Sequence, residues 1–409
     1  MTKITDIPAI RFKGFSDTWE QRKLGEIGSV SMCRRIFKEQ TSENGEIPFY
    51  KIGTFGGEAD AFISRELFEE YKAKYQYPKK GDILISASGS IGRTVVFTGK
   101  NEYFQDSNIV WLNHDKHLDN SFLKCFYSIV KWAGIEGSTI KRLYNDNILN
   151  TAITLPSVEE QQKIGAYFEN LDNLITLHQR KYDKLTNVKK SMLEKMFPQN
   201  GSNAPEIRFK GFTEAWEQRK LSEIATMHAR IGWQNLRTSE FLDSGDYMLI
   251  TGTDFIDGAV NFDTCHYVER ERYEQDKHIQ IRNGSILITK DGTLGKVAYI
   301  QGLTMPATLN AGVFNVEIKD ENEVDNRYLF QYLKAPFLMD YVDKKATGGT
   351  IKHLNQNILV DFPVVLPHKA EQEKIGEYFL AIDHLITLHQ RELEKLKNLK
   401  KACLEKMFV

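Results

Sequence analysis

Two segments of the chain, residues 155–197 and 366–408, repeat apolar side chains in alternating steps of three and four. This spacing gathers the apolar side chains on one stripe of an α-helix. The first segment opens with Pro156 and an acidic first turn and has no internal proline, which is typical of a helix start. A stripe kept for four heptads predicts a coiled coil of roughly 60 Å. It runs through Ile164, Phe168, Leu171, Ile175, His178, Tyr182, Leu185, Lys189, Met192 and Met196, and again through Ile375, Phe379, Ile382, Ile386, His389, Leu393, Leu396, Lys400, Cys403 and Met407.

The two helical segments are one of two blocks that the chain repeats. Residues 8–27 return as residues 205–224 with fifteen of twenty positions identical, and the heptapeptide at 174–180 returns unchanged at 385–391. Such a repeat determines the architecture. The chain reads as a short constant block, a variable segment and a constant helix, and then the same order again.

The two variable segments, about residues 28–154 and 225–365, share only a skeleton. An apolar run at 81–85 and a glycine-rich turn at 89–93 have counterparts at 284–288 and 292–296. Each pair predicts a buried strand followed by a turn. Later, residues 138–143 parallel residues 349–354. We therefore expect one fold with two different surfaces.

The order of the blocks predicts how the helices run. The first helix leaves the first variable segment and the second begins where the second segment ends, so a packed pair is antiparallel. We predict an α+β protein in which two similar α/β domains are joined by two long antiparallel helices, with an internal pseudo-two-fold. The predicted parts are residues 1–154 with the constant block 8–27, the helix 155–198, residues 199–365 with the constant block 205–224, and the helix 366–409.

Composition places the chain among soluble cytoplasmic proteins. It has 409 residues, of which 41% are hydrophobic and 27% charged, and it contains no apolar run long enough to span a membrane. The four cysteines are widely scattered, which predicts reduced, mostly buried thiols. The formal net charge of −1 counts against a free-standing DNA-binding protein. It is compatible with DNA binding if basic residues gather on one face or if partners supply phosphate contacts.

Two diverged modules on a shared helical framework suit the reading of two different patches on DNA. The duplicated order, the WEQRKL string at 19–24, the GDILI strand at 81–85 and the helix start with Leu-Pro, Glu-Gln and Lys-Ile-Gly resemble the specificity subunits of type I restriction-modification enzymes. The resemblance covers essentially the whole chain. It implies two target recognition domains, double-stranded DNA as ligand, and assembly with two methyltransferase and two restriction subunits. It also implies that the partners, and not this chain, bind S-adenosylmethionine, ATP and Mg²⁺.

Signatures of catalysis do not emerge from the sequence. It has neither of the NPPY and DPPY strings of adenine methyltransferases, and the turn at 292–296 is too short for a P-loop. Glu317 and Lys319 echo the acid-x-Lys half of a nuclease site, but an alternating strand explains them better. We therefore expect a non-catalytic subunit with no catalytic residue, cofactor or metal of its own. The alternatives are a self-contained site-specific nuclease or methyltransferase, and a coiled-coil scaffold that binds no DNA.

Candidate DNA contacts lie on basic and amide-rich turns, because arginine, asparagine and glutamine form bidentate bonds with base edges. In the first half they are Arg34, Arg35, Ser88, Ser90, Arg93, Lys141, Arg142 and Asn145. In the second half they are Arg230, Gln234, Asn235, Arg237, Lys290, Thr293, Lys296, Lys352 and Gln356. Lys141 and Lys352 occupy matching positions, which favours phosphate contacts for both.

Two pairs of constant residues carry further expectations. Trp19 and Trp216 are predicted to pack the constant blocks against the helices. His178 and His389 occupy matching positions near the middle of their helices, so an antiparallel pair centred there would bring the two rings together.

Overall fold

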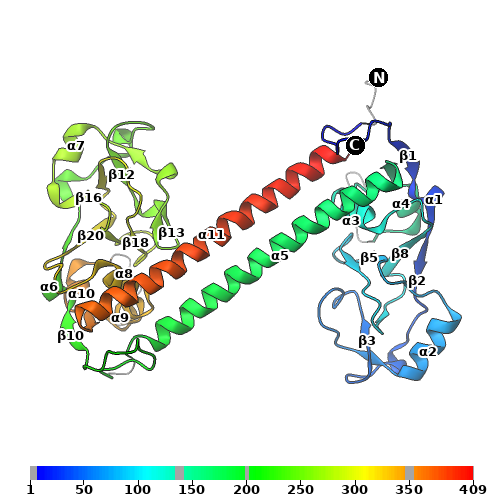
Figure 1. Ribbon diagram of the computed structural model, residues 1–409, viewed down its shortest axis with the longest axis horizontal. Helices are drawn as coiled ribbons and strands as arrows, with labels where there is room; N and C mark the ends of the chain where they lie inside the picture. Colours follow the sequence, from blue (N-terminus) through cyan, green and yellow to red (C-terminus); the bar gives the residue numbers. More distant parts are fainter. Residues whose placement is uncertain (1–6, 134–141, 199–201, 346–353, 409) are drawn as a thin grey trace. The chain divides into compact units, whose positions relative to one another are not determined.

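The computed structural model describes residues 7–133, 142–198, 202–345 and 354–408 (Figure 1). The chain divides into two compact units. The first unit comprises Met1–Gln179 and Arg391–Val409, and the second comprises Arg180–Gln390. Each unit therefore contains one variable segment, one constant block and part of each long helix, α5 (Val158–Lys195) and α11 (Lys369–Met407).

The first unit is built on three small sheets. The four-stranded antiparallel sheet has the order β2-β8-β5-β6 and the three-stranded sheet has the order β4-β3-β7, while β1 pairs with β9. The strands are β1 (Glu20–Lys23), β2 (Gly28–Met32), β3 (Ile47–Tyr50), β4 (Phe62–Ile63), β5 (Ile83–Ser86), β6 (Thr94–Val96), β7 (Tyr103–Phe104), β8 (Ile109–His114) and β9 (Ala152–Leu155). The helices outside α5 and α11 are α1 (Leu24–Ile27), α2 (Arg65–Lys74), α3 (Asn120–Ile129) and α4 (Asn145–Asn150), with the 3₁₀ turn η1 (Lys38–Gln40).

The second unit repeats this plan with additional short elements. Its sheets have the orders β11-β20-β17-β18, β15-β12-β19-β16, β10-β21 and β13-β14. The strands are β10 (Glu217–Lys220), β11 (Ala225–His228), β12 (Met248–Ile250), β13 (Phe255–Ile256), β14 (Ala259–Val260), β15 (His266–Tyr267), β16 (Gln280–Ile281), β17 (Ile286–Thr289), β18 (Val297–Tyr299), β19 (Ala307–Leu309), β20 (Val313–Ile318) and β21 (Pro363–Leu366). The helices are α6 (Leu221–Ile224), α7 (Arg270–Glu274), α8 (Asn326–Lys334), α9 (Phe337–Lys345) and α10 (Gln356–Val360), with 3₁₀ turns η2 (Gly232–Gln234), η3 (Thr238–Glu240), η4 (Gly252–Asp254), η5 (Phe262–Thr264) and η6 (Lys277–Ile279).

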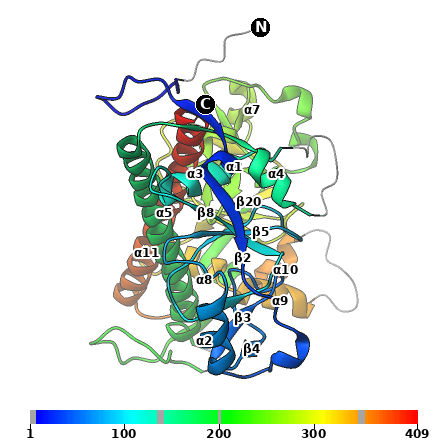
Figure 2. The same cartoon turned by 90° about the vertical axis from the view of Figure 1, so that its right-hand side faces the viewer.

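Apolar burial explains the central strands and the helices that cover them. All four residues of β5 and all four of β17 are buried, as expected for strands covered on both faces. The helix α3 begins at Asp119, whose carboxylate accepts bonds from the backbone N–H groups of Ser121 and Phe122, and Asp325 caps α8 in the same way. In the first unit, α3 lies beside α5 (Figure 2).

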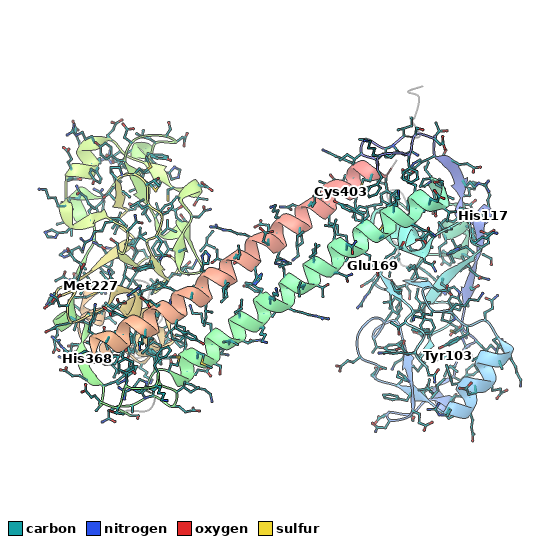
Figure 3. All side chains as sticks on the ribbon, viewed as in Figure 1. Tyr103, His117, Glu169, Met227, His368 and Cys403 are labelled. Carbon is teal, nitrogen blue, oxygen red and sulfur yellow. The ribbon has the colours of Figure 1, made fainter. Side chains whose placement is uncertain are left out.

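Each unit has two hydrophobic cores. The larger core joins both long helices to the sheet β2-β8-β5-β6 and α3 in the first unit, and to the sheet β11-β20-β17-β18 and α8 in the second. The smaller core fills the space around the sheet β4-β3-β7 in the first unit and around β15-β12-β19-β16 in the second. Tyr103, labelled in Figure 3, lies in the smaller core of the first unit. Because the larger core takes side chains from α5 and α11 in both units, the domains and the helices form continuous packed bodies.

The long helices pack antiparallel within each unit. In the first unit, Asp172 of α5 pairs with Lys400 of α11, and the Tyr167 hydroxyl lies 3.5 Å from the Cys403 sulfur. In the second unit, Lys189 Nζ lies 2.6 Å from Asp383 Oδ1. Both lysines belong to the predicted stripe, so its two charged positions are neutralised across the helix pair. Burial lowers the pKa of Lys189 to about 8.

The constant block is fastened to the start of the helix by a buried ion pair. Arg11 donates two bonds, of 2.6 and 2.8 Å, to the carboxylate of Glu160 in the first turn of α5. The side chain of Glu160 is 0% exposed. The hydrogen bond and the charge of Glu160 raise the pKa of Arg11. Arg208 and Glu371 form the same bidentate pair in the second unit.

Two further residues of the helix start hold the neighbouring helix. Gln161 is buried, and its amide bonds Asp119 N at 2.8 Å, His117 O at 3.1 Å and Pro156 O at 3.0 Å. Gly165 lies so close to α3 that a Cβ there would stand 1.8 Å from Ser121 Oγ. Gln372 and Gly376 have the same surroundings in the second unit. These contacts explain why the Glu-Gln and Lys-Ile-Gly strings recur at the start of both long helices.

Each constant block also bonds the last turn of a long helix. The backbone N–H of Ile10 donates to Lys406 O at 3.0 Å, and in the second unit Ile207 N donates to Lys195 O at 2.9 Å. Trp19 is 3% exposed and packs edge-on to Phe408, with 6.3 Å between ring centroids. Trp216 packs against Phe197 in the same way. The predicted packing role of both tryptophans is confirmed.

The predicted α+β class, with two similar α/β domains and two long packed helices, is confirmed. All four cysteines are free and buried, as expected, and burial raises the pKa of Cys33, Cys125 and Cys265 to about 12. No helix in the described ranges has both the length and the apolar character needed to cross a membrane. His178 belongs to the first unit and His389 to the second, so their proximity stays a prediction.

The Arg11–Glu160 pair predicts a large difference between two arginines of the same block. Arg11→Ala should lower the free energy of unfolding by about 3–5 kcal/mol, because it leaves a buried carboxylate without its partner. Arg22→Ala breaks only an exposed pair with Glu20 and should leave the free energy of unfolding almost unchanged. Denaturant unfolding of both variants measures the difference. Equal stability of the two variants would contradict the role given to Glu160.

Candidate nucleic-acid interface

The glycine-rich turn that follows β5 is held by a hydroxyl at the end of the strand. Ser86 Oγ donates to Ser90 O and accepts a 2.9 Å bond from Arg93 N, while Gly92 N donates to Ser86 O at 2.9 Å. Gly89 and Gly92 have φ of 66° and 79°, a region that glycine adopts without strain. The turn is thus fixed through its backbone, and its outward side chains take no part in holding it.

The turn after β17 has the same construction with other side chains. Thr289 Oγ1 donates to Thr293 O and accepts from Lys296 N at 2.9 Å, and Gly295 N donates to Thr289 O at 2.9 Å. The predicted residues Ser90, Arg93, Thr293 and Lys296 are all exposed, while Ser88 and Lys290 are half-buried. One backbone frame therefore presents serines and an arginine in one unit, and a threonine and lysines in the other.

A later segment of each domain crosses beside the turn. Leu143 N donates to Ala87 O at 2.7 Å, and in the second unit Leu354 N donates to Lys290 O at 2.8 Å. This crossing places Arg142 opposite Ser88 in an antiparallel bridge. The next helices, α4 and α10, then begin with the exposed Asn145 and Gln356. The amide of Gln356 also donates to Met227 O at 3.3 Å.

In the first unit, three predicted residues converge on the loop between β7 and β8. Arg35 Nε lies 2.9 Å from Asp106 Oδ2, and Arg142 donates to Ser107 O at 3.0 Å. Ser88 Oγ donates to Asn108 Oδ1 at 2.9 Å. Arg35, Ser88 and Arg142 come from distant parts of the sequence and meet here. The loop itself was not predicted as part of the site.

The other predicted residues stand in more open surroundings. The Arg34 guanidinium lies over the Tyr75 ring, 5.3 Å from its centroid, and Lys290 Nζ lies 5.3 Å from the centroid of Phe314. Asn235 and Arg237 are exposed on the turns that follow β11. Lys141 and Lys352 lie outside the described residues.

Arg230 differs from the rest because it is buried, with 1% of its surface exposed. All five of its N–H groups have protein acceptors: Leu309 O, Gln234 O, Gln275 Oε1, Arg272 O and Thr308 Oγ1, at 2.9 to 3.4 Å. Burial, followed by the charge of Arg272, lowers the pKa of this guanidinium. Gln234 is also buried. Neither side chain presents a free surface to a base edge, so both act in packing the second unit.

Several residues that build the site were not predicted from the sequence, and only some of these residues carry a signal in it. Ser86 and Thr289 occupy matching positions directly after the apolar run, and their shared hydroxyl could have been noticed. The loop Asp106, Ser107 and Asn108 carries no such signal, because its role comes from contacts with residues 20 to 71 positions away.

The candidate catalytic string at Glu317 belongs to a strand, as expected. Glu317 lies in β20, opposite Thr226 of β11, and Lys319 follows the strand with its Nζ bonded to Ser222 O. The two side chains therefore do not form a joint acid-lysine pair.

Comparisons with known proteins agree with this architecture. The sequence profile of the type I restriction modification DNA specificity domain matches residues 16–187 and 213–398. A putative type I restriction enzyme specificity subunit of Haemophilus influenzae is 60% identical over 158 residues, which span 38% of this chain and 41% of that protein. The putative MjaX specificity subunit of Methanocaldococcus jannaschii is 25% identical over 98% of this chain and 93% of its own length.

The fold also has a solved counterpart. The crystal structure of a type I restriction-modification system S subunit from M. genitalium covers 98% of this chain and 99% of its own, with a TM-score of 0.61 and 18% identity. Duplicated recognition units, constant helices and a profile match over most of the chain lead to one assignment. The protein belongs to the DNA specificity subunits of type I restriction-modification systems, and it is a non-catalytic subunit.

Proposed function

We propose that the protein binds a bipartite, asymmetric DNA target and that each unit reads one half. The observation that carries this proposal is the pair of turns after β5 and β17, which have one backbone frame and different outward side chains. A base edge is read through the pattern of donors and acceptors set against it. Changing side chains on a constant frame changes that pattern while the docking geometry stays the same.

The proposed contacts are the described candidates that offer surface. They are Arg34, Arg35, Ser88, Ser90, Arg93, Arg142 and Asn145 in the first unit, and Asn235, Arg237, Lys290, Thr293, Lys296 and Gln356 in the second. Lys141 and Lys352 remain proposed phosphate contacts because of their matching positions. Functionally, we keep the division into recognition domains at 1–154 and 199–365 and helices at 155–198 and 366–409.

We further propose that two methyltransferase and two restriction subunits assemble on this chain. S-adenosylmethionine, ATP and Mg²⁺ then belong to those partners, and the complex acts in the cytoplasm, where the DNA is. The support for two copies is a repeated apolar surface. On α5, Leu174 and Leu177 are 43% and 45% exposed, and on α11, Leu385 and Leu388 are 41% and 45% exposed. Leucines that the chain leaves exposed at matching positions suit two equal docking sites.

Exchange of one variable segment tests the division of labour. Replacing residues 28–154 with the equivalent segment of a relative should change one half of the methylated target and leave the other unchanged, because the frame of each unit is separate. Mapping methylated adenines in cells that carry the chimera gives the answer. The matching control replaces residues 225–365 and should change the opposite half. A chimera that alters both halves at once would refute the proposal.

Substitutions of two basic residues in the second unit should have different effects, one on DNA affinity and the other on stability. Lys296→Ala removes an exposed side chain while its backbone N–H still closes the turn, so DNA affinity should fall about tenfold with unfolding unchanged. Arg230→Met leaves several buried acceptors unbonded and should lower stability by at least about 2 kcal/mol. Fluorescence anisotropy of the methyltransferase complex on target DNA and thermal unfolding of both variants measure the two effects. Arg230 would become a contact residue if its variant kept full stability and lost binding.

The exposed leucines predict the number of partners. Changing Leu174 and Leu177 to Glu should remove one methyltransferase copy, and changing Leu385 and Leu388 as well should remove both. Mass photometry of the assembled complex counts the copies, and circular dichroism verifies that the helices persist. Leu399→Glu is the control, since Leu399 is 43% exposed on α11 at a position where the first helix has Val188. Retention of both copies by the fourfold variant would place the partners elsewhere.

A further inference from the structure

Three metal-ligating side chains meet on one face of the second unit. His228 ends β11, His278 lies in the 3₁₀ turn η6, and Glu317 lies in β20. One ligand atom from each lies within 4.8 Å of the other two. These residues are absent from the proposed DNA contacts, and the packing of the unit's cores does not use them.

Strand pairing places two of the three side chains together. In the β11-β20 register, Thr226 stands opposite Glu317, and His228 follows two residues later on the same face of the sheet. His228 Nε2 lies 3.6 Å from Glu317 Oε2 and 3.0 Å from Thr226 Oγ1. The neighbouring ring of His278 stacks on that of His228, with 4.5 Å between centroids.

The backbone of His278 is fixed from two sides. Its N–H donates to Asp276 Oδ1 at 2.9 Å, and its carbonyl accepts from Asn315 Nδ2 at 2.9 Å. Asn315 belongs to β20, the strand that also carries Glu317. The Asn315 side chain therefore bonds the main chain at His278 directly to β20, the strand that carries Glu317.

We propose that His228, His278 and Glu317 form a Zn²⁺ site. Two imidazole nitrogens and one carboxylate oxygen are a donor set that zinc takes in tetrahedral sites, with water in the fourth position. Zinc bonds of about 2.0–2.1 Å at the tetrahedral angle bring ligand atoms to about 3.3 Å from one another. The side chains are half-buried or exposed and free to make that adjustment. Magnesium and calcium prefer oxygen ligands, and the pair of imidazoles disfavours them.

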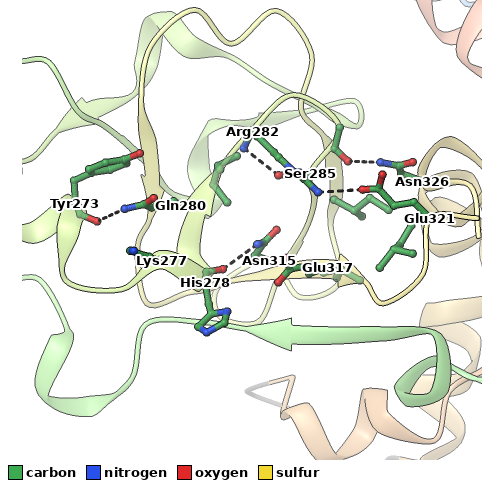
Figure 4. Close-up of a pocket in the computed structure, with 15 residues that line it drawn as sticks. Tyr273, Lys277, His278, Gln280, Arg282, Ser285, Asn315, Glu317, Glu321 and Asn326 are labelled. Carbon is green, nitrogen blue, oxygen red and sulfur yellow. Dashed lines mark hydrogen bonds and ion pairs between the residues drawn. The ribbon is translucent and has the colours of Figure 1, made fainter.

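The surroundings leave room for the fourth ligand. A pocket of about 430 Å³ borders the cluster, and His278 and Glu317 both line it (Figure 4). Asn315 stands between them in the same lining. The side chains of His278 and Glu317 are exposed, so water can reach a bound ion.

Bound zinc would clip the two main sheets of the second unit together. Two ligands come from the sheet that contains β11 and β20, and η6 leads directly into β16 of the other sheet. The first unit has Ser31 and Asn113 at the positions that correspond to His228 and Glu317 in the paired strands. The site therefore distinguishes the two recognition units and stabilises only the second.

Calorimetric titration of the untagged, metal-free full chain with ZnCl₂ at neutral pH tests the site. We expect one zinc per chain with a micromolar Kd, and binding at least tenfold weaker in His228→Gln, His278→Gln and Glu317→Gln. His117→Gln is the control, because His117 is an exposed histidine of the first unit that also bonds a carboxylate, that of Asp115. Its zinc affinity should equal that of the unchanged chain.

Two further measurements separate the site from chance binding. Cobalt should give the visible absorption of a tetrahedral centre, which the Glu317→Gln variant should weaken. Saturating zinc should raise the unfolding temperature of the full chain, and the rise should vanish in the His228→Gln, His278→Gln double variant. Equal zinc binding by that double variant and the unchanged chain would overturn the proposal. So would the absence of stoichiometric binding, or a preference for magnesium over zinc.

Discussion

The buried pair of Arg11 and Glu160, with its copy at Arg208 and Glu371, is the interaction on which the arrangement of each unit depends. A carboxylate with no exposed surface is stable only with a partner that satisfies both oxygens, and the bidentate guanidinium does so. Glu160 also stands in the first turn of α5, where the helix dipole favours a negative charge. The constant block is thereby tied to the start of a helix almost 150 residues away. The next residue, Gln161, bonds the loop before α3 to the same turn of α5. The first turn of α5 therefore holds both the constant block and the recognition domain.

The contacts at the start of the long helices must stay constant, whereas the side chains of the turns can vary. The constant blocks and helices carry the ion pair, the buried glutamine and the close approach at Gly165, all of which tolerate little change. The turns after β5 and β17 are held instead by backbone groups and by one hydroxyl, that of Ser86 or Thr289. Outward side chains can be exchanged there without loosening the frame. At these turns the two units therefore differ in residues that cost little stability to change.

Periodicity and repetition in the sequence predicted the architecture well, because both report on faces that must be buried. The stripe from Ile164 to Met196 and its copy predicted the helices, and the order of the blocks predicted their antiparallel packing. The pairing of β1 with β9 was not predicted, since the strand that pairs with residues 152–155 lies more than 120 residues earlier in the chain. For the site, local signals found the turns. They could not separate the exposed Lys296 from the buried Arg230, because burial is set by Thr308 and Leu309, residues remote in sequence.

The formal charge of −1 is also a poor guide to DNA binding, because the sum does not tell which charges are paired inside the protein. Arg11, Arg208, Lys189 and Lys400 are each paired with a carboxylate inside their own unit, so these charges largely cancel where they stand. In the proposed interface, a phosphate or a base would meet the charge at the turns, where Arg93 and Lys296 are exposed. A chain built in this way is suited to choosing a sequence while other subunits supply much of the attachment to the DNA backbone.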